Sequence, residues 1–163
     1  MTNMLSFFIR TQRSLAAALF ISCATLFVAS LHEARAQPTQ AQPMLPTLRL
    51  TAGMHVITAE LATTPATQET GLMFRKELGP NHGMLFAYAK PGPLCFWMMN
   101  TLVPLSIAFM RDDGTIVNIA DMQPMTVNSH CSAEPVRFAL EMEQGWFAKR
   151  GITSGKQITG LPK

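Results

Sequence analysis

Hydrophobic residues along the chain form one long run near the N-terminus and a series of short runs after it. The long run covers residues 15–29. From Leu48 onward the runs are short, and turn-forming residues separate them at intervals of roughly ten positions, which is typical of an all-β domain. The expected strands are 54–62, 83–88, 94–99, 105–110, 115–122, 136–142 and 156–160.

The clearest two-residue alternation lies in the segment 105–122. Apolar side chains stand at every second position of its first half, where Leu105, Ile107 and Phe109 alternate with Ser106, Ala108 and Met110. An Asp-Gly pair at 113–114 then precedes a second apolar run, and this pair is a strong turn signal between antiparallel strands. The pattern predicts a β-hairpin.

One helix interrupts the strands. Thr64 can cap its N-terminus, Pro65 suits the first helical position, and Leu72 and Met73 supply an apolar face, so we expect a short helix at about 65–73. A helical turn is expected near 146–150, before Gly151. Strands and helices do not alternate strictly, which disfavours a parallel doubly wound sheet. The predicted fold is mainly β: a compact antiparallel barrel or sandwich with one short helix.

The N-terminal segment has the three parts of a secretion signal. Arg10 and Arg13 precede the long apolar run, and Ala34 and Ala36 form an A-x-A site before Gln37. A retained membrane anchor and lipid attachment at Cys23 are the alternatives, because spanning a membrane takes roughly 20 apolar residues. The polar sequence after the A-x-A site favours cleavage. We therefore expect a signal peptide at 1–36, a disordered linker at 37–47 and one β-rich domain at 48–163.

Removing the signal peptide changes the charge balance. The whole chain has a formal net charge of +3, but residues 37–163 hold ten Lys and Arg against nine Asp and Glu. The basic excess therefore belongs mostly to the leader and does not indicate nucleic-acid binding. We expect a periplasmic or secreted protein without a stable membrane span after cleavage.

Two cysteines, Cys95 and Cys131, remain after the expected cleavage. In an oxidising compartment an even number of cysteines indicates a disulfide. Two free thiols, or a metal site shared with His130, are the alternatives. The chain has no C-x-x-C motif, which argues against thioredoxin-like chemistry and zinc ribbons.

Several segments together resemble the domain-of-unknown-function 192 family of bacterial and archaeal proteins. The resemblance covers about residues 54–160 and rests on the order and spacing of its pieces: Gly71-Leu72-Met73-Phe74-Arg75, Gly83-Met84-Leu85-Phe86, Phe96-Trp97-Met98-Met99-Asn100-Thr101, Pro104-Leu105, Phe109, Asp113-Gly114-Thr115-Ile116-Val117, Ala139-Leu140-Glu141-Met142 and Gly145-Trp146-Phe147. Met99 replaces a usual Lys and Ser106 replaces a common Asp. The resemblance implies a compact β-rich fold that is often exported, and it implies no reaction.

Four residues within these segments are candidates for a binding cleft: Arg75, Trp97, Asn100 and Glu141. Glu141 lies in an apolar strand, so it either faces a ligand or forms an ion pair with Arg75 or Arg137. Arg75 could hold an anionic group or pair with a Glu, Asn100 could bind a ligand or tie a turn together, and Trp97 could form an apolar contact patch.

Catalytic patterns are weak. His82 and His130 lie in turn-like sequence, and the chain has no G-x-S-x-G, H-E-x-x-H or P-loop motif. The ten methionines of residues 37–163 could suit Cu(I), but most fall within apolar runs, where Met fills a core.

The sequence therefore favours an exported domain without catalysis that binds a small ligand, a glycan or an envelope protein. We expect no cofactor, no metal site and no nucleic-acid partner. The alternatives are an envelope hydrolase that uses a carboxylate and a histidine as an acid/base pair, and a copper-binding protein.

Overall fold

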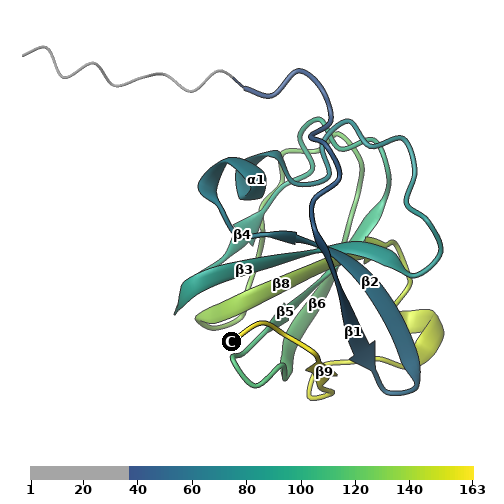
Figure 1. The fold of residues 1–163 in the computed structure, drawn as a ribbon, viewed down its shortest axis with the longest axis vertical. Coiled ribbons are helices and arrows are strands. Elements are labelled where there is room, and N and C mark those ends of the chain that lie inside the picture. The colour runs from purple at the N-terminus through teal and green to yellow at the C-terminus, as the bar shows by residue number, and fades with distance from the viewer. Residues whose placement is uncertain (1–36) are drawn as a thin grey trace, which may run out of the picture. The chain divides into compact units, whose positions relative to one another are not determined.

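A computed structural model describes residues 37–163, and the expected signal peptide lies outside the described residues. Its strands and helices, in chain order, are β1 (Thr47–Ala52), β2 (His55–Ala62), α1 (Pro65–Thr70), β3 (His82–Gly92), β4 (Cys95–Phe96), β5 (Leu105–Met110), β6 (Ile116–Met122), β7 (His130–Cys131), β8 (Val136–Glu143), the 3₁₀ turn η1 (Ala148–Arg150) and β9 (Ile158–Thr159). Seven strands form one sheet with the order β6-β5-β8-β3-β2-β1-β9, and β4 pairs with β7. The large sheet is curled into a half-barrel, with α1 and β4 on one side of it (Figure 1). The predicted β-rich fold is confirmed.

All strand pairs of the large sheet are antiparallel except β2 and β3, which run parallel. Only antiparallel pairing was expected from the sequence. A parallel pair requires a long crossover connection, and residues 63–81, which contain α1, supply it. The sequence also gave no sign of β1, which joins β2 through a two-residue turn at Gly53 and Met54. Gly53 adopts a φ of 59°, a conformation that glycine reaches without steric cost.

The predicted hairpin is formed by β5 and β6. Its turn holds Gly114 at a φ of 84°, and the Asp113 carboxylate accepts a hydrogen bond from the Thr115 backbone N–H. All six residues of β5 are buried, including Ser106, so the alternation does not separate a core side from a solvent side. The reason is that β6 and β8 flank its two edges and the two hydrophobic clusters of the domain cover its two faces.

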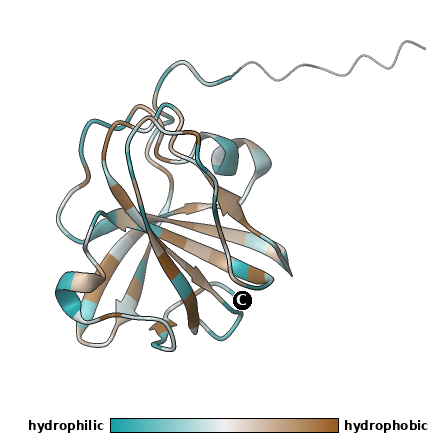
Figure 2. Cartoon of the chain, turned by 180° about the vertical axis from the view of Figure 1, so that it is seen from behind, coloured by the Kyte–Doolittle hydropathy of each residue, from teal (hydrophilic) through white to brown (hydrophobic). Residues whose placement is uncertain are grey.

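Two hydrophobic clusters cover the two faces of the sheet, and the hydrophobic residues follow the central strands (Figure 2). From Phe138 onward, successive residues of β8 point to different clusters: Phe138, Leu140 and Met142 belong to the first cluster, and Ala139 belongs to the second. Trp146 and Phe147, next to η1, complete the first cluster. Leu72, Leu94 and Met98 of the connecting segments complete the second.

Helix α1 begins as the sequence predicts and ends earlier. The Thr64 hydroxyl accepts a hydrogen bond from the Thr67 N–H, and Pro65 occupies the first turn. The helix stops at Thr70 because Gly71 leaves the helical region with a φ of 49°. Leu72 and Met73 are nevertheless buried, as expected for the apolar face. The expected turn near 146–150 is also present, as η1.

The two outer strands of the large sheet approach each other at one end. An isolated bridge links Thr115 to Gln157, and the Ile116 N–H donates to the Lys156 carbonyl at 2.8 Å. The Ile158 N–H donates to the Gly114 carbonyl at 2.9 Å. The strand β9 thus pairs with β1 on one side and lies against the start of β6 on the other.

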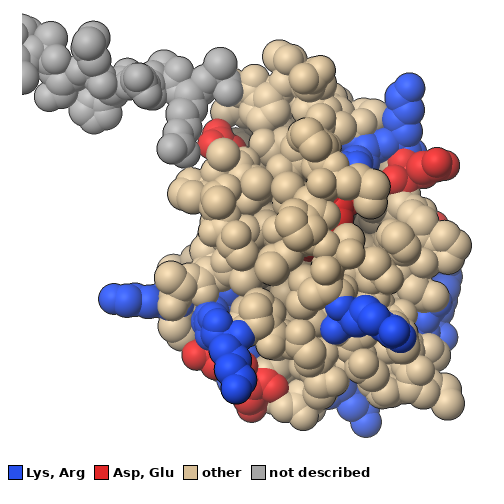
Figure 3. Space-filling view, in the orientation of Figure 1, with Lys and Arg blue, Asp and Glu red and all other residues tan. Residues whose placement is uncertain are grey.

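Residues 37–46, expected to be a linker, have no helix or strand. Hydrogen bonds hold the end of this segment against the domain: the Gln42 amide donates to the Gly71 carbonyl at 2.8 Å, and the Leu45 N–H donates to Glu60 Oε2 at 2.8 Å. Across residues 37–163, no helix has the length and apolar character needed to cross a membrane. On the face drawn in Figure 3 the upper and central area is largely uncharged, and the Lys and Arg side chains are scattered rather than gathered into one basic area.

Candidate functional site

A cleft of about 180 Å³ opens between the end of α1, the short strand β4 and the central strands β3 and β8. It lies over the face of the sheet that carries the second hydrophobic cluster. Its lining residues are Gln68, Glu69, Thr70, Gly71, Leu72, Met73, Phe86, Tyr88, Cys95, Phe96, Trp97, Thr101 and Glu141.

The floor of the cleft carries one acid, Glu141 of β8. In the strand register Glu141 stands opposite Met84 on one side and Ile107 on the other, and both of these side chains are fully buried. Only 4% of the Glu141 surface is exposed. Burial disfavours a charged carboxylate and raises the pKa of Glu141 to about 8. The group is therefore mostly neutral at pH 7.

Glu141 has neither a hydrogen bond nor an ion pair with any residue of the part of the chain that the structure describes. In that same part, Arg75 Nε is the only buried side-chain nitrogen or oxygen that is both closed off from solvent and without a partner. The carboxyl oxygens of Glu141 also lack a partner, so they must keep access to the cleft. A buried polar group without a partner costs free energy, roughly 1–3 kcal/mol when it is neutral.

Aromatic side chains form the walls. Phe86 and Phe96 meet edge to face with 4.8 Å between their ring centroids. Tyr88 lines the same cleft, and its burial, together with the nearby Glu141 charge, raises the pKa of its phenol. Trp97 stands at the mouth and is 48% exposed. The cleft thus combines an acidic floor with four aromatic side chains, and none of the described residues in its lining is a Lys, Arg or His.

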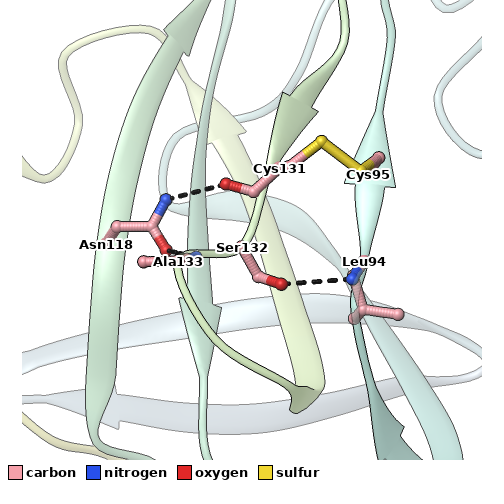
Figure 4. The surroundings of a disulfide bond; sticks show 6 residues. All are labelled: Leu94, Cys95, Asn118, Cys131, Ser132 and Ala133. Atoms are coloured by element: carbon pink, nitrogen blue, oxygen red, sulfur yellow. Dashed lines mark hydrogen bonds between the residues drawn. A yellow bond between two sulfur atoms is a disulfide. The ribbon is translucent and has the colours of Figure 1, made fainter.

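The wall that carries Phe96 and Trp97 is held in place by the predicted disulfide. Cys95 and Cys131 are directly opposite each other in β4 and β7 and are joined through their sulfur atoms (Figure 4). The Asn118 side chain donates to the Cys131 carbonyl and accepts from the Ala133 N–H, which fastens β7 to β6. The Ser132 hydroxyl accepts from the Leu94 N–H (Figure 4). The rim around Cys95 is therefore cross-linked to the body of the domain.

The structure brings together two of the four residues predicted for the cleft. Trp97 and Glu141 both line it, whereas Arg75 and Asn100 do not. Arg75 Nη2 lies 3.0 Å from Glu60 Oε2, in a mostly buried ion pair between β2 and the segment after α1. Asn100 takes a left-handed conformation with a φ of 59°, and its carbonyl accepts a hydrogen bond from the Phe74 N–H. Asn tolerates this conformation better than most residues, so Asn100 ties a turn together.

The expected ion pair of Glu141 with Arg75 or Arg137 is not formed. Arg75 is engaged by Glu60, and Arg137 Nε donates to the Tyr88 backbone carbonyl at 2.8 Å. The acid/base pair of the hydrolase alternative is not assembled among the described residues either, because none of their histidines lines the cleft. The metal site shared with His130 is not formed either: Cys95 and Cys131 are bonded to each other, and within residues 37–163 no group of three His, Cys, Asp or Glu could hold an ion.

Most methionines that raised the copper alternative lie in the core. Met84, Met98, Met110, Met122 and Met142 are fully buried. Thioether sulfurs in these positions pack against apolar neighbours, which is the ordinary use of Met in a core.

Sequence reasoning missed Gln68, Phe86, Tyr88 and Thr101, which all line the cleft. A signal for two of them was present: Phe86 and Tyr88 follow Met84 at intervals of two on β3, so they share the face on which Glu141 lies. Thr101 comes from a loop, and Gln68 is oriented by hydrogen bonds from its amide to the Ala62 and Ala87 carbonyls. Loop positions and side-chain bonds of this kind have no periodic signature.

Comparisons with known proteins give a family and several similar solved structures. The chain matches no curated protein. A crystal structure of a protein of unknown function from Novosphingobium aromaticivorans is 37% identical with a TM-score of 0.69, over 78% of this chain and 94% of that one. A protein from Sinorhizobium meliloti, provisionally described as a transcription regulator, is 34% identical with a TM-score of 0.68, over 72% of this chain and 96% of that one. The model of the DUF192 family, described as "Uncharacterized ACR", matches residues 48–160. The chain therefore belongs to the DUF192 family.

Proposed function

We propose that this protein binds a small ligand in the cleft above Glu141 and does so without converting it chemically. The observation that carries the proposal is Glu141, a residue only 4% exposed whose carboxyl group has no partner within residues 37–163 and which lines a cleft of about 180 Å³. A ligand that fills the cleft and bonds to this group would remove the cost of leaving it unpaired.

The size of the cleft restricts the ligand. Sites that enclose drug-sized molecules have volumes of roughly 300–1,000 Å³, so this cleft takes a group of a few heavy atoms or one end of a larger molecule. The exposed ring of Trp97 at the mouth offers an apolar surface to the part of the ligand that stays outside.

Binding without catalysis is favoured by the composition of the lining. Among the described residues that line the cleft, the ionisable side chains are Glu69, Tyr88 and Glu141, apart from the disulfide-bonded Cys95. No histidine among the described residues belongs to this lining, so none supplies the base of a nucleophile–base pair there. The balanced charge of residues 37–163 also gives no reason to propose nucleic-acid binding.

A fragment screen by NMR tests the proposal. We expect some fragments to shift the resonances of residues that line the cleft, and Trp97→Ala to weaken their binding at least several-fold. Met125→Ala is the matched control, because Met125 is also an exposed apolar side chain but lies outside the cleft lining. A screen in which no fragment shifts the cleft resonances, or in which both variants behave alike, contradicts the proposal.

We further propose that the protein is exported and that residues 1–36 are removed. The tripartite N-terminal pattern and the Cys95–Cys131 disulfide support this, because disulfides persist mainly in oxidising compartments. Mass spectrometry of the protein from a periplasmic or culture-medium fraction should give Gln37 as the first residue. Recovery of the chain from the cytosol with Met1 or Thr2 at its start would contradict both export and the removal of residues 1–36.

A further inference from the structure

We infer that the ligand group held in the cleft is an organic cation, a small amine or quaternary ammonium group, placed between the Glu141 carboxylate and the surrounding aromatic rings. This inference rests on the proposed function and names the chemical class of its ligand. It follows from three properties of the cleft: the acid on its floor, the aromatic rings of its walls and the signs of the charges that line it.

The acid on the floor needs an opposite charge. Among the described residues Glu141 has no cationic neighbour, since Arg75 pairs with Glu60 and Arg137 binds the Tyr88 carbonyl. A carboxylate buried in this way is stabilised when a positive charge enters beside it. A ligand cation can supply that charge, and the cleft is the route by which it reaches the carboxyl oxygens.

The walls attract the same kind of group. Phe86, Tyr88, Phe96 and Trp97 present four aromatic side chains around one small space. A cation within roughly 6 Å of a ring centroid is attracted by the negative face of the ring, by about 0.5–2 kcal/mol for each favourable contact. Enclosure by several rings together with an acid is the arrangement that selects alkylammonium groups, because these cations are bulky and weakly hydrated.

The charges on the lining disfavour the other ligand classes. An anion would meet the carboxyl group of Glu141, and none of the described residues that line the cleft is a Lys, Arg or His that could hold it. A neutral polar ligand, such as a sugar hydroxyl, can bond to Glu141 in either protonation state, but it brings no positive charge to offset that of a buried carboxylate. Such a ligand would gain little from the negative faces of the aromatic rings. A cation, in contrast, is attracted both by the Glu141 carboxylate and by these rings.

Cation binding must be coupled to proton release. In the free protein the pKa of Glu141 is about 8, so a cation that pairs with the carboxylate displaces one proton at neutral pH. The other ionisable groups that line the cleft are Tyr88 on β3, whose pKa is raised, and Glu69 in α1. The strand β5, which flanks β8 on its other side, carries no ionisable side chain. We therefore expect about tenfold tighter binding at pH 9 than at pH 7, because each pH unit below the pKa costs about a factor of ten.

The test uses choline and its neutral carbon isostere, 3,3-dimethylbutan-1-ol, which have the same shape and differ in charge. Both compounds are added to the same sample of residues 37–163, and the line widths of their methyl resonances report binding. We expect choline to bind and the isostere to bind at least tenfold more weakly at pH 9. Glu141→Gln should weaken choline binding at least tenfold at pH 9 and abolish its dependence on pH. Glu134→Gln removes an acid that pairs with Arg111 outside the cleft lining. This control variant should leave both the affinity for choline and its dependence on pH unchanged.

The other possible results of this experiment contradict the inference. Equal binding of both compounds, or retention of choline binding by Glu141→Gln, overturns the inference and leaves the cleft as a site for neutral ligands. Binding of neither compound also overturns it, and the fragment screen then decides separately whether the cleft binds any ligand. An amide spectrum that is unchanged outside the cleft verifies that the Glu141→Gln variant is folded.

Discussion

Glu141 on β8 stands directly opposite Met84 on β3, so a carboxyl group and a fully buried thioether side chain share the middle of the large sheet. Neighbouring strands in the middle of a sheet present their side chains to the same layer, and here that layer is the second hydrophobic cluster. An acid in such a layer is costly to ionise, so the stability of the domain should depend on pH through Glu141.

Glu141→Gln is expected to change how stability depends on pH. In the unfolded chain the carboxyl has a pKa near its ordinary value of 4.5, and in the folded protein the pKa is about 8. Between these values the folded protein holds a proton that the unfolded chain has lost, so unfolding is favoured as pH rises, by about 1.4 kcal/mol per pH unit. Above about pH 8 this contribution levels off.

Chemical unfolding of the wild type and the variant at pH 5 and pH 8 measures this effect. The variant lacks the contribution of this group, so its stability relative to the wild type should increase from pH 5 to pH 8. Taking the difference between the two proteins removes the contribution of the histidines. An equal difference at both pH values would show that the pKa of Glu141 is not raised.

Arg75→Met is expected to cost stability without affecting the cleft. The substitution leaves Glu60 without its cationic partner in a mostly buried position, which should destabilise the domain by about 2–4 kcal/mol. Arg111→Met is the matched control, because the Arg111–Glu134 pair is exposed and should contribute little. Denaturant midpoints compare the two variants, and loss of ligand binding by a folded Arg75→Met protein would place Arg75 in the site after all.

The disulfide is expected to stabilise the domain through its closed loop. Cys95 and Cys131 are 36 positions apart, and a loop of this length corresponds to about 3–4 kcal/mol in the chain-entropy model. The double variant Cys95→Ser/Cys131→Ser should unfold at a lower denaturant concentration than the oxidised wild type. A reducing agent should lower the wild-type midpoint and leave that of the double variant unchanged; an identical shift in both would contradict the role of the disulfide.

Gly114→Ala is expected to disrupt the contact between β6 and β9. A Cβ atom at this position would lie 2.0 Å from the Ile158 carbonyl oxygen, and the φ of 84° is unfavourable for alanine. Gly92→Ala is the control, since a Cβ there meets nothing within 4 Å. Thermal unfolding should show a large loss for the first variant and little change for the second. Similar melting temperatures would mean that the contact between these strands does not support the fold.

The sequence was most informative where local pattern determines structure. The β5–β6 hairpin, the start of α1 and the turn at 146–150 follow from periodicity, capping and Asp-Gly chemistry. The parallel β2–β3 pair depends on how a long connection crosses the sheet, which no local pattern specifies. For the site, the unusual position of Glu141 in an apolar strand was visible, whereas the partner of Arg75 was not, because Glu60 is distant in sequence and belongs to another strand.

The short strand β9 and the residues just before it matter for the expression of this domain. The two residues of β9 cover an edge of β1, and the residues just before them bridge to β6, so this short tail shields two strand borders simultaneously. Uncovered borders are templates for pairing between molecules. Ending the chain before Gln157 should therefore expose both strand edges and cause the domain to self-associate.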